Sequence, residues 1–390
     1  MRFSEIAGET GIFVDGDWIE KKDQDAKGAV RLIQLADVGP GEFRDKSDRH
    51  ITVEKADELH CTFLRKGDVL IARLGDPLCK ACVFPLDGLY ITAVDVAILR
   101  IGSDVVNPKY LIYLLNSPWF KDQVKQYESG TTRKRISRKN LGRIEMIFPP
   151  LPEQERIVAR IEELFSQLDA GVETLKKTKA QLAVYRQAVL KEAFEKVSAR
   201  VLLGSISESR LGKMLDSEKN MGVPRRYLRN INVRWHSFDL SDLSEMPIEE
   251  NEVGKYSLRK GDLVICEGGE PGRCAVWESD DVIFYQKALH RVRFTDSSNP
   301  KFYMYYLWYA AQTGQLKSLF TGTGIKHLTG QSLVKVLVPT AERITQDSIV
   351  NVIETHLSVC DSIEHTVDLA LQQAEAMRQS ILKDAFERKL

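Results

Sequence analysis

Two clusters of basic side chains are the residues of this sequence whose types and spacing point most directly to a chemistry. The first cluster contains no acidic residue and is interleaved with hydroxyl and amide side chains; its members are Arg133, Lys134, Arg135, Arg138, Lys139 and Arg143. Arginine and lysine neutralise phosphates, and short hydroxyl and amide groups add hydrogen bonds that position a duplex. A charge run is often only a solvated surface, so the prediction of DNA contact depends on where the cluster lies in the fold.

The second cluster, from Arg225 to His236, mixes arginines with Tyr, Trp and Asn side chains; its arginines are Arg225, Arg226, Arg229 and Arg234. Arginine can pair with guanine and asparagine with adenine in the major groove. Apolar residues alternate through the same stretch, which indicates that part of it is a strand. Only some of these arginines can therefore face DNA.

The segment Asn107-Pro108-Lys109-Tyr110 resembles the Asn-Pro-Pro-Tyr loop with which adenine methyltransferases hold the target amino group. Its third residue is Lys, however, and no glycine-rich cofactor loop precedes it. Asparagine caps helices, and proline is favoured at the first helical position. We therefore expect a helix start here and at the similar segment beginning with Asn299.

The glycine-rich segment from Glu267 to Arg273 lacks the Gly-Lys-Ser/Thr ending of a phosphate loop, and its two glutamates would repel phosphate. We expect a turn between strands, with close approach of its backbone to DNA as the other interpretation.

Catalytic and metal motifs are scarce. Cys79 and Cys82 have CxxC spacing, but no further ligands stand at credible distances, and each lies beside apolar residues, so core packing is favoured over a metal site. The sequence contains no nucleophile elbow and no zinc-protease motif. A self-contained methyltransferase or nuclease is therefore not indicated.

Composition sets only broad limits on the class of protein. The 390 residues carry 55 basic and 55 acidic side chains, so overall charge does not indicate nucleic-acid binding, and 43% hydrophobic content supports folded cores. No apolar run is long enough for a transmembrane helix, and the first residues lack the features of a signal peptide. We expect a cytoplasmic protein.

The sequence repeats itself after about 192 residues. Order and spacing are both preserved between two copies: Lys66–Ile71 matches Lys260–Ile265, Asn107–Tyr110 matches Asn299–Phe302, Gly130-Thr131 and Lys134 match Gly322-Thr323 and Lys326, and Arg186–Phe194 matches Arg378–Phe386. The first basic cluster thus has a counterpart in the second copy, where Lys326 and His327 are the candidates for DNA contact.

Each copy begins with strand-rich sequence and ends with strongly helical sequence. Short β-branched runs bounded by Gly, Pro and Asp alternate with the Asn-Pro helix starts, so we predict α+β globular domains over residues 1–150 and 199–340. Residues 151–198 and 341–390 form the two helical parts.

The helical parts have apolar residues spaced by three and four, as in a coiled coil. A helix of about 40 residues is about 60 Å long, so its apolar stripe needs a partner along its length. We predict that the two helices form an intramolecular antiparallel coiled coil, with a seam that includes Ile161, Leu164, Leu168, Leu175, Leu182, Ile353, Ile363, Val367, Met377 and Ile381.

The run Phe148-Pro149-Pro150-Leu151-Pro152-Glu153-Gln154-Glu155-Arg156-Ile157, the long heptad helix and the repeat of the whole pattern resemble the specificity subunit of type I restriction-modification systems. The resemblance also includes the Lys-Gly-Asp strands, the Gly-Thr turns and the RQ-LK-AF helix ends, and it covers essentially the whole chain. It implies two target recognition domains that each recognise half of a bipartite DNA site, separated by helices that set the spacing and dock two methyltransferase subunits. Restriction subunits would join this core.

The resemblance further implies that the chain is not an enzyme and binds no cofactor. S-adenosylmethionine, Mg²⁺ and ATP would be bound by the partner subunits. The second copy departs from the pattern at Val338 to Asp347, where the Pro-Pro-Leu-Pro run is missing, which leaves open how the second long helix docks its partner. The main alternative is a coiled-coil scaffold that binds only protein, and it predicts no matching basic loops in the two globular parts.

Overall fold

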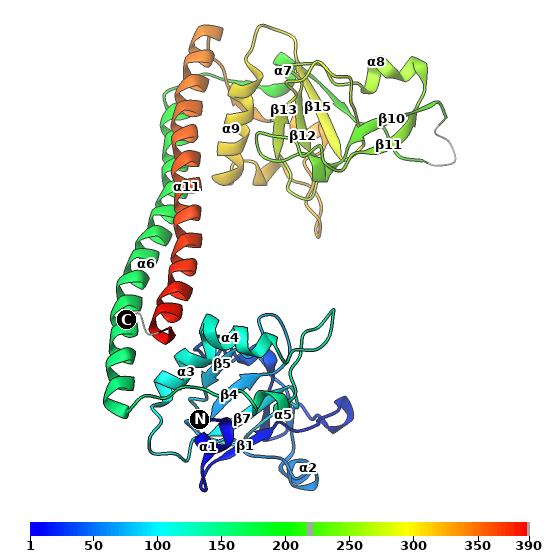
Figure 1. Cartoon of the computed structure of the whole chain (residues 1–390). Coiled ribbons are helices and arrows are strands. Elements are labelled where there is room, and N and C mark those ends of the chain that lie inside the picture. The colour runs from blue at the N-terminus through cyan, green and yellow to red at the C-terminus, as the bar shows by residue number, and fades with distance from the viewer. Residues whose placement is uncertain (217–220, 388–390) are drawn as a thin grey trace. The chain divides into compact units, whose positions relative to one another are not determined.

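The computed structural model describes residues 1–216 and 221–387. The chain divides into two compact units, one made of Met1–Leu175 with the chain from Asp368 onward, the other of Lys176–Val367. Each unit contains one globular α+β part and a stretch of both long helices (Figure 1).

The first globular part is built on a four-stranded antiparallel sheet and a smaller three-stranded sheet. In spatial order these are β1 (Ile12–Asp15), β7 (Val96–Arg100), β4 (Val69–Ala72) and β5 (Ala81–Val83), and then β3 (His50–Ile51), β2 (Val30–Ile33) and β6 (Tyr90–Thr92). Its helical segments are α1 (Phe3–Ala7), η1 (Lys21–Asp23), η2 (Leu35–Asp37), α2 (Val53–Glu58), α3 (Pro108–Asn116), α4 (Pro118–Lys125) and α5 (Arg138–Leu141).

Strand β4 shows why these short apolar runs form strands that are buried on both faces. Val69 and Ile71 belong to one apolar cluster with α3 and α4, while Leu70 and Ala72 belong to another with β2 and Phe84. Successive side chains of a strand point to opposite faces, so a continuous apolar run can supply two cores at once.

The second globular part repeats this plan. Its sheets are β13 (Cys274–Val276), β12 (Leu263–Cys266), β15 (Leu289–Phe294) and β9 (Ser207–Leu211), then β11 (Ser244–Ile248), β10 (Val223–Leu228) and β14 (Phe284–Tyr285), and finally the pair β16 (Leu337–Pro339) and β8 (Arg200–Leu202). Its helical segments are α7 (Leu203–Ile206), η3 (Asn230–Asn232), η4 (Glu250–Glu252), α8 (Val253–Tyr256), α9 (Pro300–Gln312), η5 (Lys317–Leu319) and α10 (Gly330–Leu333).

Matching ion pairs show that the repeat is structural. The Lys-Gly-Asp aspartate is buried in both copies and pairs with an arginine of the neighbouring strand, Asp68 with Arg100 at 2.7 Å and Asp262 with Arg293 at 2.6 Å. The two four-stranded sheets therefore have the same strand order and the same buried ion pair, which we call the Asp–Arg clamp.

The Asn-Pro segments start helices, as expected. The Asn107 side chain accepts hydrogen bonds from the backbone N–H groups of Lys109 and Tyr110 at the start of α3, and Asn299 accepts one from Lys301 at the start of α9. The catalytic-loop interpretation is therefore wrong, because the asparagine side chains serve as N-caps.

The long helices α6 (Leu151–Glu195) and α11 (Arg343–Phe386) begin in the same way despite their different sequences. The side-chain oxygen of Gln154 accepts a hydrogen bond from the Asn107 backbone at 2.9 Å, and that of Gln346 accepts one from Asn299 at 2.7 Å. Both glutamines are buried. The start of α11 is therefore tied to its globular part without the Pro-Pro-Leu-Pro run.

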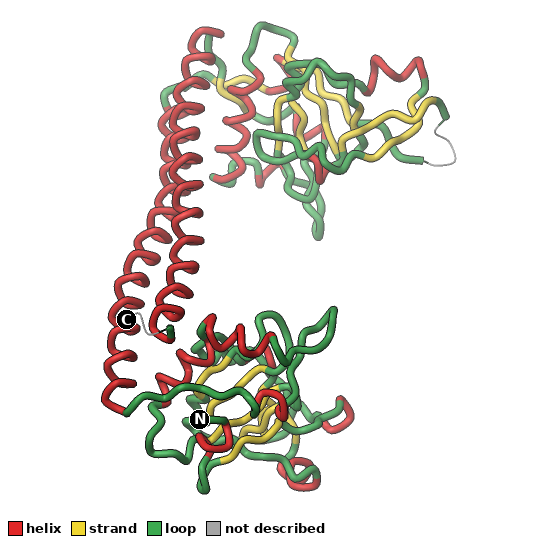
Figure 2. The backbone as a smooth tube through the Cα atoms, in the orientation of Figure 1, coloured by secondary structure: helices red, strands yellow, loops and turns green. Residues whose placement is uncertain are grey.

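Helices α6 and α11 pack against each other in antiparallel orientation, which confirms the predicted intramolecular coiled coil (Figure 2). Within the first unit Arg378 pairs with Asp169 and lies over the Phe165 ring. Within the second unit Arg186 pairs with Asp361 at 2.7 Å and with Glu364 at 2.8 Å. Arg186 and Arg378 occupy the same position of the repeat, so each unit contains the same interhelical pair.

The predicted seam positions differ in burial. Ile161, Leu182, Ile353 and Val367 are buried, whereas Leu164, Leu168, Leu175 and Ile381 are half-buried. Ile363 is 39% exposed and Met377 is 55% exposed, so neither belongs to the seam. The next residues, Glu364 and Arg378, form the interhelical ion pairs instead, because long charged side chains at the seam edge can reach the opposite helix.

The remaining motifs are structural. Cys79 and Cys82 lie in apolar clusters, and burial raises the pKa of their thiols to about 11 and about 12, so thiolate formation is disfavoured. The segment Glu267–Arg273 is the turn between β12 and β13, as expected. Across the described ranges, no three His, Cys, Asp or Glu side chains gather as metal ligands do. None of the described helices is both long and apolar enough to span a bilayer.

Candidate nucleic-acid interface

The Gly-Thr segments of the repeat form a hairpin in each globular part. We call them the first hairpin, Ser129 to Arg135, and the second hairpin, Thr321 to His327. In each, the two end residues exchange backbone hydrogen bonds of 2.9 Å. The tips of both hairpins are exposed.

A glycine is required near the start of each hairpin. Gly130 has a φ of +92° and Gly322 a φ of +96°, and an added Cβ would lie 2.3 Å from the carbonyl oxygen of Arg133 or Ile325. Only glycine adopts this conformation without strain. The Gly-Thr signature in the sequence is therefore a turn requirement.

The first hairpin is fixed to the main sheet of its domain. The Gly75 backbone N–H donates to the Lys134 carbonyl at 3.0 Å, and Ile136 donates to the Arg73 carbonyl at 3.0 Å. These bonds connect the hairpin to the chain that follows β4. Its exposed side chains are thus presented by a rigid scaffold.

Five basic side chains of the first cluster divide into two groups. Arg138 is engaged by its own domain, since it donates to Asp15 at 3.1 Å and to the Phe13 carbonyl at 3.0 Å, and Lys134 lies 3.6 Å from Glu128. Arg133, Arg135 and Lys139 are exposed, and within the described residues they form no ion pair. These three cations are available to an external anion.

The second cluster is largely neutralised by carboxylates of its own domain. Arg225 pairs with Glu250 at 3.2 Å and lies over the Phe284 ring, Arg229 pairs with Asp242 at 2.6 Å, and Arg234 lies 3.5 Å from Asp239. Arg226 is exposed and, over the part of the chain that the structure describes, has no such partner. The prediction that these arginines contact DNA therefore requires three of them to leave existing pairs.

The second hairpin forms one wall of an open groove of about 650 Å³. Lys326 is exposed and donates to the Gly322 carbonyl at 2.7 Å, and His327 is exposed beside it. The groove, which we call the Gln286 groove, is lined by Met214, Leu215, Glu267, Gln286, Lys287, Ala288, Thr321, Gly322, His327 and Thr329.

Gln286 and Lys287 were not singled out by the sequence clusters. They follow β14 directly, and at the same positions of the repeat the first copy has Ala93 and Val94. The exchange of two small apolar residues for two long polar ones, inside an otherwise matching frame, is the signal that could have found them.

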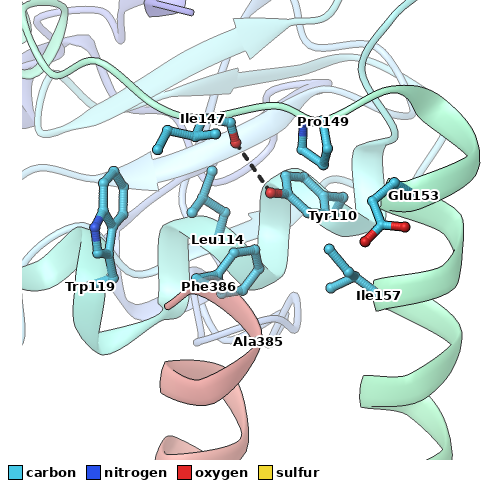
Figure 3. A pocket seen from close by; sticks show the side chains of 9 residues that line it. All are labelled: Tyr110, Leu114, Trp119, Ile147, Pro149, Glu153, Ile157, Ala385 and Phe386. Atoms are coloured by element: carbon cyan, nitrogen blue, oxygen red, sulfur yellow. Dashed lines mark hydrogen bonds between the residues drawn. The ribbon is translucent and has the colours of Figure 1, made fainter. Parts of the chain in front are cut away.

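Two other hollows do not fit phosphate. One of about 390 Å³ in the first unit is mainly apolar and lined by aromatic side chains, and it contains the hydrogen bond from Tyr110 to the Ile147 carbonyl (Figure 3). Its one charged lining residue is Glu153. A larger hollow of about 850 Å³ is lined by more carboxylates, including Glu162 and Glu375, than cations. The hairpins remain the best candidates for DNA contact.

Comparison with known proteins agrees with this geometry. Residues 12–183 match the family described as the type I restriction modification DNA specificity domain. This segment contains the first hairpin and most of α6. The first copy is therefore similar to a DNA specificity domain.

The chain as a whole resembles the specificity subunits of type I restriction enzymes. It is 23% identical over 308 residues to the EcoKI specificity subunit of Escherichia coli K12, covering 72% of this chain and 65% of that protein. It is 26% identical over 311 residues to the StySPI specificity subunit of Salmonella potsdam, covering 73% and 66%. The chain thus spans slightly less than two thirds of the length of these two relatives.

Solved structures share the fold over nearly the whole chain. A chain in a structure concerned with complex assembly and conformational transition of the type I R-M system matches with a TM-score of 0.74 at 18% identity, covering 100% of this chain and 97% of that chain. The HsdS subunit from Thermoanaerobacter tengcongensis matches with a TM-score of 0.56 at 18% identity, covering 98% of both chains. The likeness establishes two α+β domains with two long helices.

Proposed function

We propose that this chain is the DNA sequence-recognition subunit of a type I restriction-modification complex. In this proposal each globular part is a target recognition domain that recognises one half of a bipartite site. The observation that carries the proposal is the repeated hairpin, which presents basic side chains from the same scaffold in both copies. The match of the first copy to a DNA specificity domain supports it.

The differences between the copies suit a target with two different halves. The first hairpin carries Arg133 and Arg135 where the second carries Ile325 and His327. Phosphate contacts position a protein on DNA, whereas contacts to base edges carry the sequence information. Equal scaffolds with unequal polar side chains would therefore place two domains on DNA in the same way and select different bases.

The partner subunits complete the proposed complex. We propose that α6 and α11 separate the recognition domains and dock two methyltransferase subunits, and that restriction subunits join this assembly in the cytoplasm. The chain itself would catalyse no reaction, and S-adenosylmethionine, Mg²⁺ and ATP would be bound by its partners. The resemblance to specificity subunits of restriction enzymes supports this division of labour.

The test is sequencing of methylated bases in DNA from cells that express this chain with its neighbouring methyltransferase, compared with cells that lack only this chain. A split methylated motif that depends on the chain is the expected result. Methylation that is independent of the chain, or a competent methyltransferase that gives none with it, would refute the proposal. Titration of the purified complex with duplex DNA separates it from a protein-only coiled-coil scaffold, which would not bind.

A further inference from the structure

The Gln286 groove has the composition of a surface that recognises base edges. Gln286 offers an amide, Lys287 an ammonium and Glu267 a carboxylate, and exposed Met214 and Leu215 provide apolar contact surface. Glutamine pairs with adenine, lysine with guanine, and glutamate accepts from cytosine in the major groove, while apolar groups contact the thymine methyl. The groove therefore contains one side chain suited to each type of base.

The two central side chains are available for such contacts. Gln286 is half-buried and Lys287 is exposed, and among the described residues neither side chain forms a hydrogen bond or an ion pair. This state contrasts with Arg225, Arg229 and Arg234, each of which already has a carboxylate partner. A bound base edge would not have to displace an internal partner from Gln286 or Lys287.

The backbone that carries these side chains is held on both sides. The Gln286 N–H donates to the Leu228 carbonyl at 3.1 Å, and the Lys287 N–H donates to the Lys213 carbonyl at 2.9 Å. Base recognition requires side chains presented from a rigid support. Residues 286 and 287 satisfy that requirement, because backbone hydrogen bonds anchor them to two neighbouring segments.

The second hairpin is anchored to the same strand end. The Glu267 N–H donates to the Ala288 carbonyl at 3.0 Å, and its carbonyl accepts from Leu328 at 2.7 Å. An added Cβ at Gly268 would lie 3.0 Å from Nδ1 of His327, so the glycine-rich turn packs directly against the hairpin. A duplex held by Lys326 of the hairpin would thus pass beside the Gln286 groove.

Comparison of the copies separates scaffold from variable positions around the groove. The Gly-Thr turn, the hairpin lysine and the Asp–Arg clamp occur in both, whereas Gln286 and Lys287 replace Ala93 and Val94, and His327 replaces Arg135. Side chains that differ on a shared scaffold are what two domains with different targets require.

We propose that Gln286 and Lys287 are base-recognition residues of the second half-site, and that the carboxylate-paired Arg225, Arg229 and Arg234 are not. Gln286 contacts an A·T pair and Lys287 a neighbouring G·C pair. The inference rests on the proposed function, since it assigns the specificity of one of the two recognition domains.

The test uses the complete chain with its methyltransferase and compares the methylated motifs of Gln286→Ala and Lys287→Ala with that of the unsubstituted chain. Each variant is expected to relax one position of one half of the motif, with discrimination reduced about 5- to 150-fold. The other half of the motif should stay unchanged, and it reports that the complex is folded and active. Gln286→Glu and Lys287→Gln keep side-chain size and serve as second variants if an alanine variant lowers the melting temperature.

Arg229→Ala, Arg234→Ala and Lys326→Ala are the controls. The first two should leave the motif unchanged, and Lys326→Ala should lower methylation evenly at all sites. A motif unchanged by the Gln286 and Lys287 variants, an even loss of methylation without a relaxed position, or relaxation caused by the arginine variants would each overturn the inference. Absence of any motif that depends on the unsubstituted chain would instead refute the proposed function, and the inference with it.

Discussion

Removal of the two unpaired arginines of the first hairpin should change the salt dependence of DNA binding by a calculable amount. Each phosphate neutralised on duplex DNA contributes about 0.9 to the slope of log affinity against log salt concentration. Arg133 and Arg135 are exposed and lack ion pairs among the described residues, so the double alanine variant should reduce the slope by about 1.8. Lys134 already lies 3.6 Å from Glu128, so its replacement should reduce the slope further by less than the contribution of one phosphate.

The assay is fluorescence anisotropy of a labelled duplex with the assembled complex, at salt concentrations from about 50 to 200 mM. Over that fourfold increase in salt, the fold-loss of affinity should be about 12 times smaller for the variant than for the unsubstituted complex. The charge-matched control is Lys66→Ala with Lys125→Ala, since both lysines are paired, with Asp87 at 3.3 Å and Asp122 at 2.7 Å. An unchanged slope in the hairpin variant, or an equal change in the control, would remove the first hairpin from the interface.

Other consequences of the structure can be measured with single variants. Gly322→Ala should destabilise the second unit by about 1 to 3 kcal/mol, because a Cβ at a φ of +96° would meet the Ile325 carbonyl; urea unfolding measures this, and an unaffected midpoint would contradict the turn requirement. Leu182→Ala should lower the free energy of unfolding by about 2 to 5 kcal/mol and Met377→Ala by less than about 1 kcal/mol, because Leu182 is 8% and Met377 is 55% exposed. Equal losses in thermal melting would show that Met377 packs in the seam after all. Leu175→Pro should destabilise helix α6 by about 3 kcal/mol or more and abolish assembly with the methyltransferase. Retained assembly and DNA modification would refute the role of the coiled coil in holding the complex together. Burial lowers the pKa of both His290 and His236 to about 4, so the folded state favours neutral imidazoles and its stability should fall as pH decreases from about 6.5 to about 4. His290→Leu should remove the part of this fall that His290 causes, and an identical profile in the variant would exclude that contribution.

The sequence alone determined the architecture. The repeat, the Asn-Pro helix starts and the heptad spacing are patterns between residues close in the chain, and local backbone preferences and burial of an apolar face are enough to interpret them. The α+β domains and the two paired helices therefore followed from sequence, as did the turn between β12 and β13.

The seam register in α11 depended on tertiary structure. Ile363 and Met377 fit a heptad as well as their neighbours do, because spacing by three or four leaves two adjacent positions equally plausible. The choice was made by charged groups of the opposite helix: Glu364 turns toward Arg186, and Arg378 toward Asp169. Those partners lie far away in the sequence, so local periodicity contains no information about them.

The availability of the basic side chains was also decided by the fold. Composition made both Arg225 to Arg234 and Arg133 to Lys139 candidates for DNA contact. In the fold, Glu250, Asp242 and Asp239 neutralise three arginines of the second cluster, while Arg133 and Arg135 lie on an exposed hairpin. Gln286 and Lys287 differ from their counterparts in the first copy, but the fold is what shows that β14 ends beside the second hairpin and places them in the groove. A side chain's chemistry is set by its type, but whether that chemistry is free to act depends on which distant residues the fold brings within a few ångströms.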